Sequence, residues 1–222
     1  MQEFVIIVAG GKGTRMKSEV PKQFLYVNGM PVLMHTILAF RKYSADINII
    51  LVLPEDQFSF WNQLCMEHAF KVNYTLVNGG ETRFHSVKNG LGSITVNEGI
   101  VAVHDGVRPL IDKEIIKNSF LAAEKLGTAV TCVNLKDSIR FTDQNGSNKA
   151  MERTNFRLIQ TPQTFRLEWM RKAFSVDYNT GFTDCASVLE AAGYSIHLIE
   201  GAYENIKITT PEDLTWAQIL LK

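Results

Sequence analysis

The stretch Glu3-Phe-Val-Ile-Ile-Val-Ala-Gly-Gly-Lys-Gly-Thr-Arg-Met16 decides the fold of this chain. It begins with an apolar run long enough for a buried strand and continues into a loop with three glycines. Such a loop after a strand is typical of the carboxyl edge of a parallel sheet, where backbone N–H groups bind anions. The stretch therefore predicts an α/β fold with a phosphate site near its N-terminus.

This loop fits neither of the two common glycine motifs. In the dinucleotide pattern, Met16 stands where the third glycine belongs, and in the Walker A pattern Lys12 is not followed by Ser or Thr. Its cations are more informative, because Arg15 offers a planar fork for phosphate oxygens and Lys22 offers a compact charge. Two different cations near one glycine loop favour a triphosphate over a neutral ligand.

Apolar runs of strand length alternate with segments of helical period along the chain. Short apolar strands separated by helices predict parallel crossovers and a sheet that is covered on both faces. We therefore expect an α/β fold with a mostly parallel, doubly wound sheet, in one domain over residues 1–222. The expected strands are Phe4–Ala9, Ile47–Leu53, Val72–Val77, Ile100–Val103 and Ala129–Val133.

Four boundaries of three helices are indicated by the residues that usually occupy such positions. Pro31 precedes a segment whose apolar residues share one helical face, and we expect a helix to begin there. Asp112 is expected to cap a second helix, which Gly127 ends. Thr210 and Pro211 provide an N-cap and a proline at the first helical position, so a C-terminal helix is expected to start there.

Residues 136–161 interrupt the alternation of strands and helices. Ser138–Thr142 has the pattern of a strand, and Asp143-Gln-Asn-Gly146 is a turn signal before a polar return strand that leads to Phe156–Ile159. The segment predicts a β-hairpin arm inserted late in the domain. Because such an arm buries little against its own core, we expect it to act as a lid or to reach a second subunit.

The composition narrows the class of protein. Lys and Arg together number 23, as do Asp and Glu, so no basic excess indicates a nucleic-acid or membrane-surface partner. The three cysteines are widely spaced and follow no metal-ligand pattern, which favours reduced thiols. The N-terminus lacks the features of a signal peptide and no apolar run is long enough for a membrane span, so we expect a cytoplasmic protein.

Two further loops follow predicted strands. In the stretch 78–86, two glycines permit close backbone approach, and Arg83 and Ser86 are three residues apart, so they can share a helix face. In the stretch 103–109, Asp105 and Gly106 follow an apolar strand, a common position for residues that bind a ribose hydroxyl or a divalent ion. We expect the neighbouring His104 to make a structural hydrogen bond rather than to ligate a metal.

Motifs that match one known family occur in order from residue 8 to residue 214. Together they resemble the CTP-dependent nucleotidyltransferases of the family that includes 2-C-methyl-D-erythritol 4-phosphate cytidylyltransferase. No single motif is decisive, but the ordered set is specific. The matching stretches are VAGGKGTRM (8–16), PKQF (21–24), GGETRFHSV (79–87), HDGVRP (104–109), TPQTF (161–165), TDCASV (183–188) and NIKITTPEDL (205–214).

The resemblance implies a Rossmann-like domain whose arm completes a homodimer, and it implies roles for individual residues. The implied catalytic residues are Arg15 and Lys22. The implied nucleotide contacts are Ala9, Gly10, Gly11, Gly13, Thr14, Gly80, Glu81, Arg83, Ser86, Asp105 and Gly106. The residues implied to position a sugar-alcohol phosphate are Arg153, Thr161, Thr183 and Lys207, some of them from the neighbouring subunit. Mg²⁺ is expected to be held mainly by the CTP phosphates, with Asp105 as a candidate ligand.

Two other functions are compatible with these motifs. The first is cytidylyl transfer to a different acceptor, and the second is nucleotide binding without catalysis. A relative that uses ribitol 5-phosphate or another polyol phosphate would have a similar CTP site. We favour methylerythritol phosphate, because Arg153 stands eight residues before Thr161, as in the methylerythritol enzymes. A non-catalytic nucleotide-binding module would not need all the cations around the reacting phosphate. The chain departs from the family at Glu204, where an aspartate is often found.

Overall fold

The central layer of the protein is a seven-stranded sheet with the strand order β11-β7-β10-β6-β1-β4-β5. The computed structural model describes residues 1–11 and 20–221. The strands are β1 (Glu3–Val8), β4 (Asn48–Leu53), β5 (Thr75–Asn78), β6 (Ile100–Asp105), β7 (Thr128–Asn134), β10 (Arg157–Arg166) and β11 (Leu198–Glu200). All adjacent pairs are parallel except those that β10 makes with β6 and β7. The prediction of a mostly parallel sheet is confirmed.

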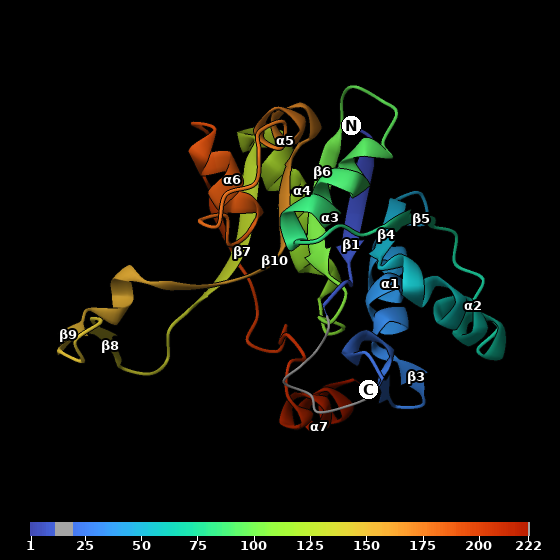
Figure 1. Cartoon of the computed structure of the whole chain (residues 1–222), viewed down its shortest axis with the longest axis horizontal. Helices are drawn as coiled ribbons and strands as arrows, with labels where there is room; N and C mark the ends of the chain where they lie inside the picture. Colours follow the sequence, from blue (N-terminus) through green and yellow to red (C-terminus); the bar gives the residue numbers. More distant parts are fainter. Residues whose placement is uncertain (12–19, 222) are drawn as a thin grey trace.

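Helices cover both faces of this sheet (Figure 1). They are α1 (Val32–Tyr43), α2 (Phe58–Glu67), α3 (Arg83–Gly92), α4 (Lys113–Leu126), α5 (Leu167–Ala173), α6 (Cys185–Ala191) and α7 (Pro211–Leu220). Shorter elements are the 3₁₀ turns η2 (Lys22–Phe24), η3 (Glu55–Gln57) and η4 (Arg153–Asn155), and the strand pair β2 (Tyr26–Val27) and β3 (Met30–Pro31). No helix in the described part of the chain is long and apolar enough to cross a membrane.

The side chains of β1 show why the strand is apolar throughout. Val5 and Ile7 belong to one buried cluster, which includes residues of α1, α2 and α4. Phe4 and Ile6 belong to a second cluster, which includes residues of α3, α5 and α6. Because successive side chains of a strand point to opposite faces, a strand between two helical layers must be apolar at every position.

The predicted helix boundaries are confirmed. α1 starts immediately after Pro31, and the Asp112 side chain at the start of α4 accepts a hydrogen bond from the backbone N–H of Glu114. Gly127 ends α4 in the left-handed conformation, with φ of 88°. α7 has Pro211 in its first turn and a capping box at Thr210. Local capping therefore sets the ends of these helices, as the sequence predicts.

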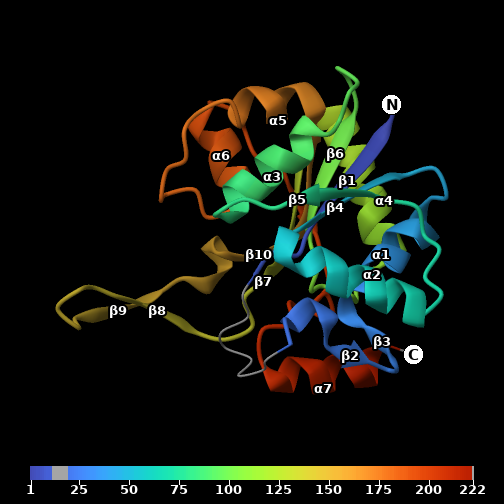
Figure 2. The same cartoon turned by 45° about the vertical axis from the view of Figure 1, so that its right-hand side comes forward.

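The arm extends away from the body of the protein (Figures 1 and 2). Its hairpin consists of β8 (Ile139–Thr142) and β9 (Asn148–Met151), and Gly146 occupies the turn with φ of 80°. The predicted hairpin is therefore present. The sequence did not predict that the chain continues as β10 into the centre of the sheet, where it runs antiparallel between β6 and β7.

Candidate functional site

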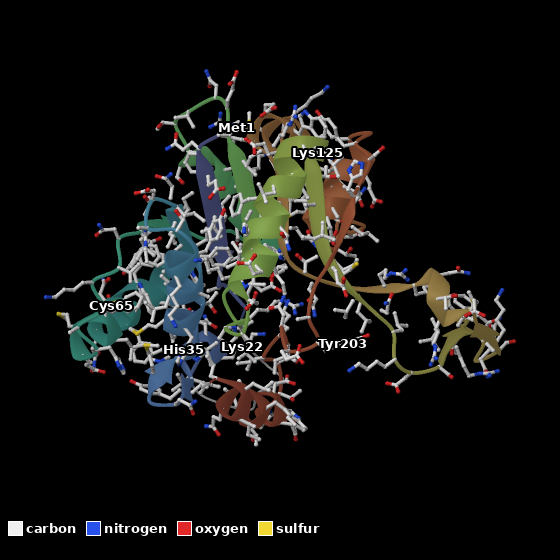
Figure 3. The ribbon with its side chains drawn as sticks, turned by 180° about the vertical axis from the view of Figure 1, so that it is seen from behind. Met1, Lys22, His35, Cys65, Lys125 and Tyr203 are labelled. Atoms are coloured by element: carbon white, nitrogen blue, oxygen red, sulfur yellow. The ribbon has the colours of Figure 1, made fainter. Side chains whose placement is uncertain are left out.

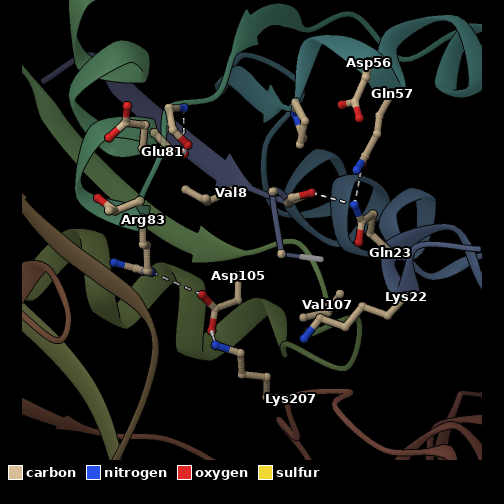
Figure 4. A pocket seen from close by; sticks show the side chains of 17 residues that line it. Val8, Lys22, Gln23, Asp56, Gln57, Glu81, Arg83, Asp105, Val107 and Lys207 are labelled. Atoms are coloured by element: carbon tan, nitrogen blue, oxygen red, sulfur yellow. Dashed lines mark hydrogen bonds and ion pairs between the residues drawn. The ribbon is translucent and has the colours of Figure 1, made fainter. Parts of the chain in front are cut away.

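A cavity of about 730 Å³ lies at the carboxyl ends of β1, β4, β5 and β6 (Figure 4). Its wall includes the first glycine loop at Gly10 and Gly11, and it brings together cationic and acidic side chains from distant parts of the sequence. Figure 3 shows Lys22 toward the end of the sheet that is opposite Met1. The crevice at the carboxyl edge of an open α/β sheet is the usual ligand site of such folds.

Asp105 is the electrostatic centre of this cavity. Its Oδ1 lies 3.6 Å from Arg83 Nε, and its Oδ2 lies 3.0 Å from Lys207 Nζ and 3.2 Å from Arg108 Nε. Burial raises the pKa of the Asp105 carboxyl, but the combined effect of Arg83, Lys207 and Arg108, which lower it, is larger. The net pKa of Asp105 therefore lies well below the usual range. One carboxylate among three cations leaves a net positive charge, which favours an anionic ligand.

Arg108 connects Asp105 to the segment that carries Lys207. The Arg108 side chain is buried, and its Nη1 donates a hydrogen bond to the backbone oxygen of Asn205 over 2.7 Å. Asn205 is fully buried and donates through Nδ2 to the backbone oxygen of Thr161 over 2.8 Å. We assigned no role to Arg108 from the sequence, although its place three residues after Asp105 is a signal for this contact.

His104 and Thr161 lie behind Asp105, and neither lines the cavity. His104 Nε2 is 3.1 Å from the backbone oxygen of Arg108, which can only accept, so Nε2 carries the proton. Nδ1 therefore accepts from the Thr161 hydroxyl at 3.1 Å, and Thr161 Oγ1 in turn accepts from the Asp105 N–H at 3.0 Å. Burial lowers the pKa of His104 to about 4, so the ring is neutral at pH 7. The structural hydrogen bond expected for His104 is present.

The second glycine loop is shaped by contacts within itself. Ser86 Oγ accepts a hydrogen bond from the Gly80 N–H over 3.1 Å, and Thr82 caps α3 by accepting from the His85 N–H. A Cβ atom at Gly80 would lie 2.4 Å from Cβ of His85, so only glycine fits at this position. The loop therefore presents a fixed backbone edge to the cavity, which Gly80, Glu81, Arg83 and Ser86 all line.

The first glycine loop is described only up to residue 11. Ala9 continues the sheet through a hydrogen bond from its N–H to the backbone oxygen of Val52, and Gly10 and Gly11 line the cavity beside Lys22. Gly106 packs directly under this loop, since a Cβ atom there would lie 2.8 Å from Cβ of Ala9. The predicted site residues Gly13, Thr14 and Arg15 lie outside the described residues.

Arg153 and Thr183 lie outside the cavity wall. Arg153 is exposed on the arm, and its Nη1 donates to the backbone oxygen of Lys136 at the base of the same arm. Thr183 is exposed, one residue before the Asp184 cap of α6. Cys185, the first residue of α6, is buried, and its Sγ accepts a hydrogen bond from Arg83 Nη1 over 3.2 Å. Arg83 is thus held between Asp105 and Cys185, a contact that we did not predict.

Comparison with known proteins assigns the family. The model of the IspD family, 2-C-methyl-D-erythritol 4-phosphate cytidylyltransferase, matches residues 4–222. The chain belongs to this family. An IspD-family relative from Bacteroides thetaiotaomicron, named 2-C-methyl-D-erythritol 4-phosphate cytidylyltransferase, is 51% identical over 221 residues, which cover 100% of both chains. A relative of the same name from Bacillus velezensis is 38% identical and covers 100% of this chain and 97% of its own.

Solved structures with the same fold carry IspD names as well. The structure of 4-diphosphocytidyl-2C-methyl-D-erythritol synthase from Anaerococcus prevotii superposes with a TM-score of 0.84 at 27% identity, covering 99% of this chain and 96% of that one. The Francisella tularensis IspD has a TM-score of 0.83 at 31% identity, with 99% and 100% covered. Membership of this family makes the chain a nucleotidyltransferase.

Proposed function

We propose that the chain joins CTP and 2-C-methyl-D-erythritol 4-phosphate to give 4-diphosphocytidyl-2-C-methyl-D-erythritol and pyrophosphate, a step of non-mevalonate isoprenoid biosynthesis. The observation that carries this proposal is the cavity in which Lys22, Arg83 and Lys207 meet at the edge of the first glycine loop. Two anionic substrates have to approach each other in this reaction. The cluster around Asp105, in which one carboxylate lies among three cations, carries the excess positive charge that stabilises that approach.

The chain acts by positioning and by charge. A phosphate oxygen of the acceptor attacks the α-phosphorus of CTP in line, and pyrophosphate leaves. Because the nucleophile is already an anion at neutral pH, no general base is needed, and the difficulty is the extra negative charge in the transition state. Lys22 and Arg15 stabilise that charge, and Lys207 holds the acceptor phosphate at the side of the cavity where it pairs with Asp105.

Mg²⁺ fits this site as an ion bound chiefly by the substrate. No cluster of three or more metal-binding side chains occurs in the part of the chain that the structure describes. Three cations surround Asp105, so a metal ion ligated by Asp105 would have to approach against their positive charge. When bound, the ion would neutralise charge on the CTP phosphates. Asp105 then acts mainly by holding Lys207 and Arg83 in place.

The identity of the acceptor is tested by comparing the rates with two polyol phosphates. We expect pyrophosphate release from CTP with 2-C-methyl-D-erythritol 4-phosphate and a much lower kcat/KM with ribitol 5-phosphate, measured at equal enzyme and Mg²⁺ concentrations. Equal or faster turnover with ribitol 5-phosphate would identify the chain as the alternative enzyme. CTP binding without pyrophosphate release from either acceptor would support a non-catalytic module.

We further propose a cytoplasmic homodimer that is completed by the arm. Large apolar side chains are exposed along the arm and its base, which is unfavourable for an isolated subunit in water. The exposed residues are Phe141, Phe156, Leu158 and Ile159. Arg153 points its guanidinium at its own Lys136 backbone and lies outside the cavity of its own subunit, so its role in acceptor binding requires the cavity of the neighbour.

Replacement of Arg153 by alanine is expected to raise the KM for the acceptor by about tenfold or more and to leave the KM for CTP unchanged. Loss of one charge-assisted hydrogen bond to phosphate is worth roughly this factor. Initial rates at varied acceptor and fixed CTP measure the effect. A change confined to the KM for CTP would contradict the assignment.

Mixed dimers test whether Arg153 acts across the interface. A dimer of one Arg153→Ala subunit and one Lys207→Ala subunit contains one intact site only if Arg153 serves the neighbouring cavity. We therefore expect that mixing and reassembling the two variants gives more turnover, at an acceptor concentration below the wild-type KM, than either variant alone. Mixed dimers with no more activity than the separate variants would place Arg153 in its own subunit's chemistry or outside the reaction.

A further inference from the structure

Gln23 is a buried polar residue in the wall of the cavity to which the proposed reaction assigns no role. It follows Lys22 in the turn η2, and its side chain is only 1% exposed. Its Nε2 donates two hydrogen bonds, one to the backbone oxygen of Ala9 over 2.8 Å and one to Gln57 Oε1 over 2.7 Å (Figure 4). One amide thus connects three segments: the end of β1, the turn η2 and the turn η3.

The contacts of Gln23 set its orientation. Both hydrogens of its amide group are used, while its Oε1 is buried and has no hydrogen-bond partner among the residues that the structure describes. An unpaired buried acceptor is unfavourable, and the few that occur in native proteins need an explanation. The orientation of the amide is therefore set by the two hydrogen bonds that its Nε2 donates, despite the unpaired Oε1.

The turn that carries Lys22 has a second anchor on its other side. Phe24 is 1% exposed, and its ring packs against Phe60 and Trp61 with centroid distances of 5.3 and 6.1 Å. Phe24 therefore fixes the turn to the core. The connection from the turn to the start of the first glycine loop is made on the other side, by the hydrogen bond between Gln23 and Ala9.

Lys22 and the glycine loop are close enough for such a connection to affect both. A Cβ atom at Gly11 would lie 3.7 Å from Lys22 Cε, so the lysine side chain passes beside the loop into the cavity. Ala9 stands two residues before Gly11 and begins the loop. The distance between the Lys22 ammonium and the loop N–H groups thus depends on how η2 is held against Ala9.

We propose that Gln23 is a positioning residue for cytidylyl transfer, which sets the Lys22 side chain against the first glycine loop so that both meet the same triphosphate. This inference rests on the proposed function and assigns no direct substrate contact to Gln23. The hydrogen bond to the Ala9 oxygen fixes the position of Lys22 against the loop, and the hydrogen bond to Gln57 holds the Gln23 amide in its orientation. Replacement of Gln23 is therefore expected to lower kcat/KM for CTP mainly in enzyme that retains Lys22.

The test is a double-mutant cycle with Lys22, measured as kcat/KM for CTP. Gln23→Met keeps the volume of the side chain but cannot donate, and we expect it to lower kcat/KM by about tenfold, the scale for losing buried hydrogen bonds. In the Lys22→Ala background, the same change is expected to have an effect of less than about twofold. Independent effects that multiply in the double variant would overturn the proposal.

A second variant separates the two hydrogen bonds of Gln23. The carboxylate introduced by Gln23→Glu still reaches Gln57, whose amide can rotate and donate to it, but it presents only acceptors to the Ala9 oxygen. We expect Gln23→Glu to lower kcat/KM at least as much as Gln23→Met. A Gln23→Glu enzyme with wild-type kinetics would show that the bond to Ala9 is not needed.

A matched control distinguishes positioning from lost stability. Ser119→Ala removes a hydroxyl that accepts a 3.0 Å hydrogen bond from the buried Thr164 Oγ1, outside the cavity wall. We expect it to lower the Tm and to leave kcat/KM for CTP unchanged, whereas Gln23→Met changes kcat/KM. An equal loss of kcat/KM in both variants would overturn the proposal. If the wild-type enzyme itself releases no pyrophosphate, the proposed function fails instead.

Discussion

Replacement of Lys22 by alanine is expected to lower kcat for cytidylyl transfer by about 10²-fold or more, the scale for losing one preorganised group that stabilises transition-state charge. The physical reason is that the negative charge on the α-phosphate rises in the transition state, while the Lys22 ammonium is already held beside the glycine loop. Little change in folding is expected, because the side chain is only half-buried. Pyrophosphate release at saturating substrates measures kcat, and thermal unfolding measures stability.

Two further variants define what Lys22 contributes. Lys22→Arg keeps the positive charge but replaces a compact ammonium with a planar fork, so we expect partial activity. Lys71→Ala removes an exposed lysine outside the cavity wall and is expected to leave turnover unchanged, which controls for the overall charge of the protein. Unchanged turnover in Lys22→Ala would remove Lys22 from the chemistry.

Replacement of Asp105 by alanine is expected to abolish detectable turnover and to lower the free energy of unfolding by about 3–5 kcal/mol, the usual cost of breaking a buried ion pair from one side. Most of this loss comes from Arg108, whose side chain is 10% exposed and would be left without its partner. Arg83 and Lys207, with side chains 28% and 40% exposed, contribute less because water can solvate them. Urea denaturation at pH 7 measures the change.

The pH dependence of stability provides an independent check on Asp105. Because its folded pKa is depressed, its contribution is fully present above the unfolded carboxyl pKa of about 3.9 and is lost as the pH falls toward the lower folded pKa. The stability difference between wild type and Asp105→Asn should therefore shrink below about pH 4. His104, whose burial lowers its pKa to about 4, titrates in both proteins; because Asp105 is one of the groups that raise this pKa, the His104 titration makes a partly opposing contribution to the difference. A difference that stays constant down to pH 3 would contradict the ion-pair account.

Much of the fold follows from local patterns in the sequence. The apolar runs identified β1, β4, β5, β6 and β7 but not the short strand β11, which pairs in parallel with β7. The caps at Asp112, Gly127 and Thr210 marked helix ends because each side chain or backbone conformation acts locally. The expected strand from Val72 was too long at its start, since β5 begins at Thr75. Apolar residues before it, such as Val72, pack against the core without pairing in the sheet.

The strand β10 was missed for a physical reason. Pro162 lacks an N–H donor, which argues against a central strand at this position. In the structure the register of β10 against β7 shifts between Ile159 and Gln163, and the strand continues on both sides of this irregularity. Such tertiary pairing depends on partners far away in the sequence, so no local pattern announces it.

Some residues of the candidate site could be predicted from the sequence, and others could not. Asp105 and Arg83 were selected because they follow predicted strands, and Lys22 because it is near the first glycine loop. Lys207 was selected from the resemblance to the family, and the structure places all four on one cavity wall. Their catalytic and binding roles remain predictions. Arg108, Gln23 and Cys185 act through buried contacts with other protein groups, and a residue type alone does not show which partner it will meet. Their arrangement required the three-dimensional structure.

The path of the chain through β7, the arm and β10 has a consequence for variation of the protein. The arm leaves the end of β7 and returns as β10, its neighbour in the sheet, so both ends of the arm are fixed by the same ladder of backbone hydrogen bonds. Residues added or removed at the tip, around Gly146, change the reach of the arm without altering the register of either strand. A deletion near Ile159 would instead shift Thr161 relative to Asp105. The tip of the arm can therefore vary in length while the cavity at the carboxyl edge of the sheet keeps its shape.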